Sequence, residues 1–270
     1  MTIAVNIPRM QAWTGDGIGW LVFDQPGRHN AVSQDMWAGM ADILAAFERD
    51  DAVRVIVMRG AGEKAFVSGG DISEYEDRLA GASAGEDARA RYHASAEQGM
   101  KALRSTGKPV ICLIHGYCLG GGILIALQAD IRIAADDARF SIPAAKLGIG
   151  YPYRDVEKLA QLIGPAATAE MLFTARVFDA AEAGALGLVN RVVPKAELDE
   201  TVRRTALAIA GNAPLTLRAA KAAIRAAMQD PARRDRAAVD ALVAACQNSA
   251  DFLEGSRAFM EKRKPRFTGR

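Results

Sequence analysis

The sequence predicts an α/β fold that ends in a run of helices. Three observations support this class: strand-like and helix-like segments alternate over the first three-quarters of the chain, one strand candidate is apolar on both faces, and the last quarter shows helical patterns alone. Strand, helix and strand at this spacing favour βαβ units with parallel strands. We therefore expect an α/β core over residues 1–195 and a helical region over residues 196–270.

The first elements follow from their apolar patterns. Ile18–Phe23 is predicted to be a short apolar strand, closed by the turn sequence Asp24-Gln25-Pro26-Gly27. Val53–Met58 is predicted to be a second strand and Pro109–Ile114 a third, which is apolar enough to be buried on both faces of a parallel sheet. Between the first two strands, Ser33 is placed to cap a helix. The apolar residues that repeat on one face of this helix are Met36, Met40, Ile43, Leu44 and Phe47.

The last quarter of the chain is predicted to hold four helices in succession. Pro214, Pro231 and the Asn248-Ser249 pair separate them. Their predicted ranges are Lys195–Ala210, Leu215–Met228, Ala232–Cys246 and Asp251–Lys262. Ala-rich amphipathic helices without a strand partner need another surface to cover their apolar faces, so we expect them to pack on the core or on another subunit.

The composition excludes several classes of protein. Half of the 270 residues are apolar and 24% are charged, which is enough apolar surface to order the chain. The formal net charge of +2 is too small to indicate a nucleic-acid track. Three cysteines at spacings that match no zinc pattern are expected to be reduced thiols. With no apolar run of membrane-spanning length and no signal-peptide pattern, the protein is expected to be cytoplasmic, with no membrane partner.

Two loops that contain glycines are the candidate functional site. The first, Ala61–Asp71, follows the second strand, and the second, His115–Gly122, follows the third strand and opens an apolar helix over Ile123–Ala129. Bare N–H groups at a helix start stabilise negative charge. Three interpretations remain open: close helix packing, a phosphate site, or an oxyanion hole made by the N–H groups of Ser68 and Gly121. The glycine spacing fits neither the dinucleotide nor the nucleotide-triphosphate motif, which disfavours phosphate.

The two loops together resemble those of the crotonase (enoyl-CoA hydratase/isomerase) superfamily. The matching stretches are Lys64-Ala65-Phe66-Val67-Ser68-Gly69-Gly70-Asp71 and Gly116-Tyr117-Cys118-Leu119-Gly120-Gly121-Gly122, with a third at Asp179–Ala183 through Gly187–Asn190. The resemblance extends from Arg28-His29-Asn30-Ala31 to Phe259-Met260-Glu261-Lys262-Arg263. It implies stacked ββα turns, a C-terminal helical region that builds trimers or dimers of trimers, and acyl-CoA thioesters as substrates.

The resemblance also assigns roles to residues. The N–H groups of Ser68 and Gly121 would hold the thioester oxygen as it becomes an enolate. Coenzyme A would enter as part of the substrate, with no other cofactor and no metal. The residues implied to contact it are Arg28, His29, Ala31, Lys64, Phe66, Gly69, Gly70, Asp71 and Ile72, with Phe259 and Lys262 reaching the coenzyme A of a neighbouring subunit.

The sequence departs from the hydratase pattern at both acid/base positions. Family hydratases use two glutamates around one water, and the corresponding positions here are Leu124 and Ala144. Neither side chain can exchange a proton. The stretch around Tyr151 is similar to that of methylmalonyl-CoA decarboxylases, which also lack the glutamates and have a functional tyrosine at this position. Those decarboxylases carry a histidine where this chain has Gly70.

Several other groups are candidate acids or bases. Asp155, Glu74 and Glu76 follow or flank the expected acyl pocket, and Tyr151 is either a weak acid or a wall of the pocket. Asp71 is expected to support its loop by hydrogen bonds. His115 is expected to pack or to give polar support.

The sequence leaves three classes of function open. The first is an enoyl-CoA hydratase/isomerase-family enzyme that acts through a thioester enolate, with a decarboxylase or an isomerase as alternatives. The second is a family member that binds acyl-CoA but has lost its chemistry. The third, an RNA-binding side role, depends only on the basic tail Lys262–Arg266, which we expect to be solvated instead.

Overall fold

The fold is described by a computed structural model that covers residues 7–71 and 82–270; of residues 82–89 only the helical backbone is described. Two sheets organise it. The larger sheet has the order β1-β2-β3-β5-β7-β10 and the smaller one the order β4-β6-β8-β9. Among the described strands, β1 with β2 and β8 with β9 pair antiparallel, and the other pairs are parallel. The strands of the larger sheet are Met10–Gly15, Ile18–Phe23, Val55–Gly60, Val110–Ile114, Ile131–Ala135 and Arg191–Val193, and those of the smaller sheet are Ala65–Val67, Tyr117–Leu119, Arg139–Ser141 and Phe178–Asp179.

Each long parallel strand in the middle of the chain is followed by a short strand of the second sheet. β3 leads to β4, β5 to β6 and β7 to β8, and helices α3 and α4 separate these pairs. The helices are α1 (Gln34–Arg49), α3 (Ala82–Ser105), α4 (Gly121–Gln128), α5 (Ala144–Leu147), α6 (Tyr153–Thr174), α7 (Ala180–Ala185), α8 (Leu198–Ala210), α9 (Pro214–Ala227), α10 (Arg236–Gln247) and α11 (Ala250–Met260). This repetition confirms the expected stacked ββα core.

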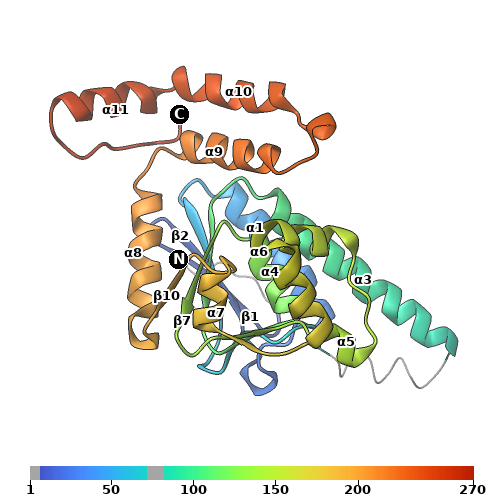
Figure 1. Cartoon of the computed structure of the whole chain (residues 1–270). Helices are drawn as coiled ribbons and strands as arrows, with labels where there is room; N and C mark the ends of the chain where they lie inside the picture. Colours follow the sequence, from blue (N-terminus) through green and yellow to red (C-terminus); the bar gives the residue numbers. More distant parts are fainter. Residues whose placement is uncertain (1–6, 72–81) are drawn as a thin grey trace.

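The larger sheet is covered on both faces, as the apolar third strand predicts. Val110, Cys112 and Ile114 of β5 face the main core, while Ile111 and Leu113 face α8 on the other side. Figure 1 shows α8 along one side of the sheet and α1, α3, α4 and α6 on the opposite side. Side chains alternate between the faces of a strand, so a strand covered on both sides is apolar throughout.

The helices after α8 form a separate layer. α9, α10 and α11 lie beyond one end of the core in Figure 1, and α9 packs against α10. α8 itself packs on the sheet through Leu198, Val202 and Ala206. The expected boundary at residue 195 therefore precedes one helix that covers the core, and the outlying layer begins at Pro214. Among the described residues, no helix has the length and apolar character needed to cross a membrane.

Candidate active site

The two glycine-bearing loops meet because the strands before them are neighbours. β4 pairs in parallel with β6, so both chains leave the small sheet at the same edge. Gly69 follows β4 and has a φ of +113°, which a residue with a side chain rarely adopts. A Cβ atom on Gly121 would lie 3.5 Å from the Cα of Gly69 and 3.6 Å from the nitrogen of Gly70. The amides of Gly70 and Gly121 are thus close together.

The directions of the hydrogen bonds decide which amides face this meeting point. The N–H of Ser68 donates to the carbonyl of His29 at 3.1 Å, so it is already used. The bridge between Val32 and Gly70 uses the carbonyl of Gly69 and the N–H of Asp71, which leaves the N–H of Gly70 directed away from Val32. The prediction that Ser68 supplies an oxyanion donor is therefore wrong, and Gly70 is the residue of this loop whose N–H is available at the meeting point.

The N–H of Gly121 is the second amide available at this meeting point. Gly121 is the first residue of α4, and the first N–H groups of a helix have no acceptor within the helix. Among the described residues, neither Gly121 nor Gly70 has a backbone acceptor for its N–H. The preceding Gly120 has a φ of +51°, and its N–H donates to the carbonyl of Ser141 at 2.8 Å, which fixes the start of the helix. Two amide donors with the positive end of a helix dipole can stabilise an oxyanion.

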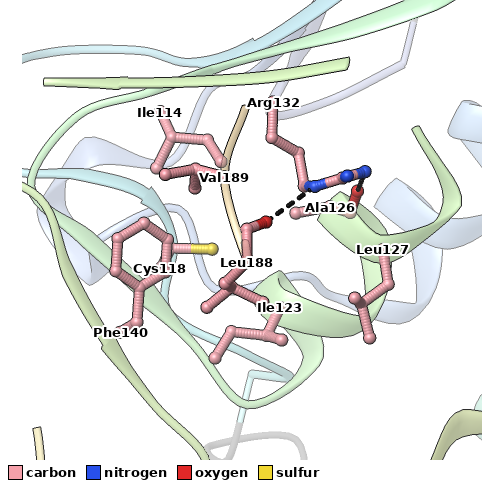
Figure 2. Close-up of a pocket in the computed structure, with 9 residues that line it drawn as sticks. All are labelled: Ile114, Cys118, Ile123, Ala126, Leu127, Arg132, Phe140, Leu188 and Val189. Carbon is pink, nitrogen blue, oxygen red and sulfur yellow. Dashed lines mark hydrogen bonds between the residues drawn. The ribbon is translucent and has the colours of Figure 1, made fainter. Parts of the chain in front are cut away.

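The far end of α4 is fixed by a buried arginine. Arg132 donates to the carbonyls of Leu188 and Ala129, each at 2.8 Å, and more weakly to Ala126 at 3.5 Å. Figure 2 shows its guanidinium between Leu188 and the helix, beside a wall of apolar side chains. This region has no room for a water-sized molecule, so it is packed core. Arg132 satisfies carbonyls at the C-terminal end of α4 and so holds the helix that presents Gly121.

The segment from Gln25 to Ala31 is tied to the first loop. Asn30, with a φ of +56°, donates to the carbonyls of Ala61 and Ala65 and accepts the N–H of Gln25. Asp71 is buried and accepts from Arg28 at 2.9 Å and from Gln25 at 3.1 Å. The Asp71 carboxylate thus holds the side chains of Arg28 and Gln25, which belong to the segment beside the loop.

A depression of about 300 Å³ lies between these segments. His29, Ala61 and Lys64 are among the residues that line it. Lys64 is exposed, and the half-exposed Arg28 directly precedes His29 in the chain. The ring of His29 also contacts the exposed ring of Tyr117, with centroids 5.7 Å apart.

Other predicted coenzyme A contacts lie elsewhere. Phe66 is fully buried and packs edge-on against Phe23, so it belongs to the core and the prediction for it is wrong. Phe259 and Lys262 lie at the end of α11, where Phe259 lines a groove made by residues of the C-terminal region. Ile72, like Glu74 and Glu76, lies outside the described residues.

The two positions that hold glutamates in family hydratases carry apolar side chains here. Leu124 is half-buried, one turn beyond Gly121 on α4, and packs against the main core. Ala144 is buried at the start of α5. Tyr151 does reach the loops, since a Cβ atom on Gly120 would lie 3.4 Å from its hydroxyl oxygen. Asp155 is buried in the first turn of α6.

His115 is buried, so it packs in the fold, which is one of the two roles expected for it. It is buried at the end of the third core strand, and its Nε2 has no hydrogen-bond partner among the described residues. Burial, with Arg59 and Lys195 nearby, lowers the pKa of its imidazole. A neutral ring is therefore favoured.

The sequence analysis missed Tyr92, which packs against the first glycine loop. Tyr92 donates to the carbonyl of Val32 and accepts from Trp37 Nε1, each at 3.0 Å, and its hydroxyl stands behind Gly70. Asn30 is visible in the sequence as an Asn able to adopt a left-handed turn. Tyr92 carries no comparable signal.

Comparisons with known proteins agree with this architecture. A model of the enoyl-CoA hydratase/isomerase family matches residues 14–270. A crotonyl-CoA hydratase of Syntrophomonas wolfei is 34% identical over 92% of this chain and 93% of the relative. A carnitinyl-CoA dehydratase of Proteus mirabilis is 36% identical over 93% of this chain and 94% of the relative. The crystal structure of an enoyl-CoA hydratase/carnithine racemase from Magnetospirillum magneticum matches with a TM-score of 0.90 and 34% identity, over 98% of this chain and 97% of that one.

Proposed function

The chain belongs to the enoyl-CoA hydratase/isomerase family of the crotonase superfamily, and we propose that it acts on acyl-CoA thioesters through an enolate held by the N–H groups of Gly70 and Gly121. The observation that carries this proposal is the convergence of these two amides at the edge of the small sheet. When the bond from Cα to hydrogen breaks, its electron pair moves onto the thioester oxygen. Preorganised donors stabilise that charge.

The coenzyme A portion is proposed to lie over the depression beside His29 and Lys64. Lys64 and Arg28 supply positive charge for its phosphates, and Asp71 keeps Arg28 in place through the hydrogen bond between them. Asn30 joins the Gln25–Ala31 segment to the first loop. The surface proposed to bind coenzyme A and the oxyanion site are therefore held in a fixed position relative to each other.

The test compares two substitutions at Gly121. Gly121→Pro removes the N–H at a helix position where proline is tolerated, and we expect turnover to fall by about 10²–10³-fold. Gly121→Ala is the control, because its methyl group would meet neighbours at 3.5–3.6 Å, which is ordinary contact distance, and the N–H remains. Turnover is measured by mass spectrometry on enoyl-, hydroxyacyl- and malonyl-type thioesters, and affinity by calorimetry. Equal turnover in the two variants would refute the oxyanion assignment.

A second candidate function is decarboxylation of a malonyl-type thioester. It is favoured by the hydroxyl of Tyr151 at Gly120, beside a site whose hydratase positions are Leu124 and Ala144. Loss of carbon dioxide needs only an acceptor for the electron pair and a weak acid to protonate the carbon. Release of carbon dioxide from the malonyl-type thioester, abolished in Tyr151→Phe, would favour this reaction. Water gain or loss would favour hydratase chemistry, and binding of every thioester without any product would favour the binding-only alternative.

A further inference from the structure

Helix α3 reaches the first glycine loop through the hydroxyl of Tyr92. A Cβ atom on Gly70 would lie 2.5 Å from this oxygen, so the hydroxyl lies directly against the Cα of Gly70. Tyr92 is only 4% exposed, which places the contact inside the fold and away from the solvent. Tyr92 therefore forms the wall behind one of the two amides that converge at the edge of the small sheet.

A hydrogen-bonded bridge sets the direction of the Gly70 N–H. The N–H of Val32 donates to the carbonyl of Gly69 at 2.8 Å. This carbonyl and the N–H of Gly70 belong to one peptide plane and point in opposite directions. The bond from Val32 therefore turns the Gly70 N–H to the side of the loop opposite Val32.

The hydroxyl of Tyr92 holds Val32 in place for this bridge. It donates to the carbonyl of Val32 at 3.0 Å, and the same carbonyl accepts the N–H of Asp71 at 3.0 Å. A carbonyl oxygen has two lone pairs, so it can accept both bonds. Tyr92 thus acts on Gly70 in two ways, by direct contact at its Cα and through the backbone of Val32.

The hydroxyl of Tyr92 is itself fixed by α1. Trp37 Nε1 donates to the hydroxyl oxygen at 3.0 Å, so the hydroxyl proton is the one that bonds Val32. Further along α3 the two helices pack closely, because a Cβ atom on Gly99 would lie 2.7 Å from the carbonyl oxygen of Trp37. The packing of α1 against α3 therefore sets the position of the hydroxyl independently of the glycine loop.

The loop needs such a support because two adjacent glycines flank the peptide that carries the donor. Gly69 has a φ of +113°, and a glycine backbone rotates more readily than that of any other residue. An oxyanion donor is effective only when it is held within about 0.5 Å of its productive position. The loop sequence alone does not supply that rigidity, whereas Tyr92 and Val32 do.

We propose that Tyr92 is a positioning residue for the reaction, whose hydroxyl holds Val32 and the Cα of Gly70 so that the Gly70 N–H stays directed at the thioester oxygen. The inference rests on the proposed thioester function. Tyr92 acts through the amide and transfers no proton, because its hydroxyl bonds Val32 and Trp37. Loss of the hydroxyl removes one donor from the carbonyl of Val32 and opens space behind Gly70. The amide then loses its fixed direction while the thioester still binds.

The experiment measures the hydrogen bonds to the thioester oxygen directly. The full-length protein binds a saturated four-carbon acyl-CoA labelled with carbon-13 at the carbonyl, and difference infrared spectroscopy follows the C=O stretching band. Hydrogen-bond donors lower this frequency, so the wild-type band is expected below that of the free thioester. In Tyr92→Phe we expect the band to move back toward the free value. We also expect kcat to fall by at least about tenfold on any thioester that the wild type turns over, with KM changed by less than about twofold.

Leu103→Val is the matched control. Leu103 is buried on the same helix, 11 residues and about 16 Å beyond Tyr92, so this change lowers stability without touching the bonds at Gly70. The control is expected to keep the wild-type band and kcat. A purely structural Tyr92 would behave in the same way, with a lower melting temperature and an unchanged band, which would overturn the proposal. If Tyr92→Phe does not fold, Trp37→Phe, which removes the donor to the hydroxyl, takes its place, and an unshifted band there would equally overturn it.

The two proposals fail in different ways. If the wild-type protein binds no thioester, the thioester function itself fails. If it binds the thioester with the band of the free molecule, the oxyanion site assigned to Gly70 and Gly121 fails. If the wild-type band is lowered and Tyr92→Phe gives the same band, only the role of Tyr92 fails.

Discussion

The hydroxyl of Tyr92 leaves no room for a side chain at position 70. A Cβ atom there would lie 2.5 Å from the hydroxyl oxygen, which is held by Trp37 and Val32. We expect Gly70→Ala to lower the free energy of unfolding by about 1–3 kcal/mol, because the buried ring must shift. Tyr92→Phe removes the oxygen, so Gly70→Ala is expected to cost at least about 1 kcal/mol less in that background. Urea denaturation of the wild type, both single variants and the double variant measures the difference, and strictly additive effects would contradict it.

At the scale of residues, the sequence predicts which two loops lie together but not which amide of the first loop faces the second. It predicts that two glycine loops lie together, which the structure shows, and it selects Gly121, whose N–H is available there. It cannot distinguish Ser68 from Gly70, because the choice depends on the bridge to Val32, from a distant segment, that turns one amide inward and the other toward His29. The prediction that Phe66 contacts coenzyme A is wrong for a similar reason, since only the packed core shows that its ring lies against Phe23.

At the scale of elements, α6 carries a partly buried lysine, Lys158, and burial destabilises its charged form. Burial, with Arg132 and Arg225 nearby, lowers the pKa of Lys158 to about 8 from 10.5. Between these two pH values the unfolded chain binds more protons, so the free energy of unfolding rises as pH increases from about 8 to 10.5. Lys158→Met is expected to reduce this rise and to stabilise the protein at pH 7 by about 1–2 kcal/mol, after the loss of the bond to Gln128.

Urea denaturation at pH 7 to 10 measures the effect. Lys221 lies against Asp130, and burial lowers its pKa to about 8 as well, so part of the pH dependence remains in Lys158→Met. An unchanged slope with pH in that variant would contradict the prediction.

The predicted elements are right where their patterns are long. The strand Ile18–Phe23 and the helix capped by Ser33 are confirmed, and the Ser33 side chain accepts the N–H of Met36. The predicted strand Val53–Met58 begins two residues before β3. Val53 is apolar and buried like a strand residue, although it lies outside the strand. The short strands of the small sheet escape prediction, since two or three residues show no period. Yet these strands bring the two loops together.

At the scale of the whole molecule, the C-terminal layer exposes a cluster of large apolar side chains. Phe252, Leu253, Phe259 and Met260 are all more than half exposed on α11, beside a groove of about 540 Å³. Such a patch indicates an interface between protein surfaces. The helices α9–α11 lie beyond one end of the core in Figure 1, and α9 is joined to the core by Lys221 at Asp130 and Arg218 at Glu48. The exposed side chains of α11 are therefore available to other copies of the chain. We expect this layer to contact another copy of the chain, in the trimer or pair of trimers that the resemblance to the crotonase superfamily implies.

Phe259→Glu places a charge in this patch and is expected to shift the mass in solution toward the monomer. The physical reason is that burying an unpaired carboxylate in an apolar interface costs several kcal/mol per subunit. Light scattering after size-exclusion chromatography measures the mass, and circular dichroism checks that the helices remain. Ala181→Glu, at an exposed position of α7, is the control and is expected to keep the wild-type mass. An unchanged oligomer in Phe259→Glu would mean that the subunits contact each other through another face of the chain. A monomeric wild type would contradict the prediction of an oligomer altogether.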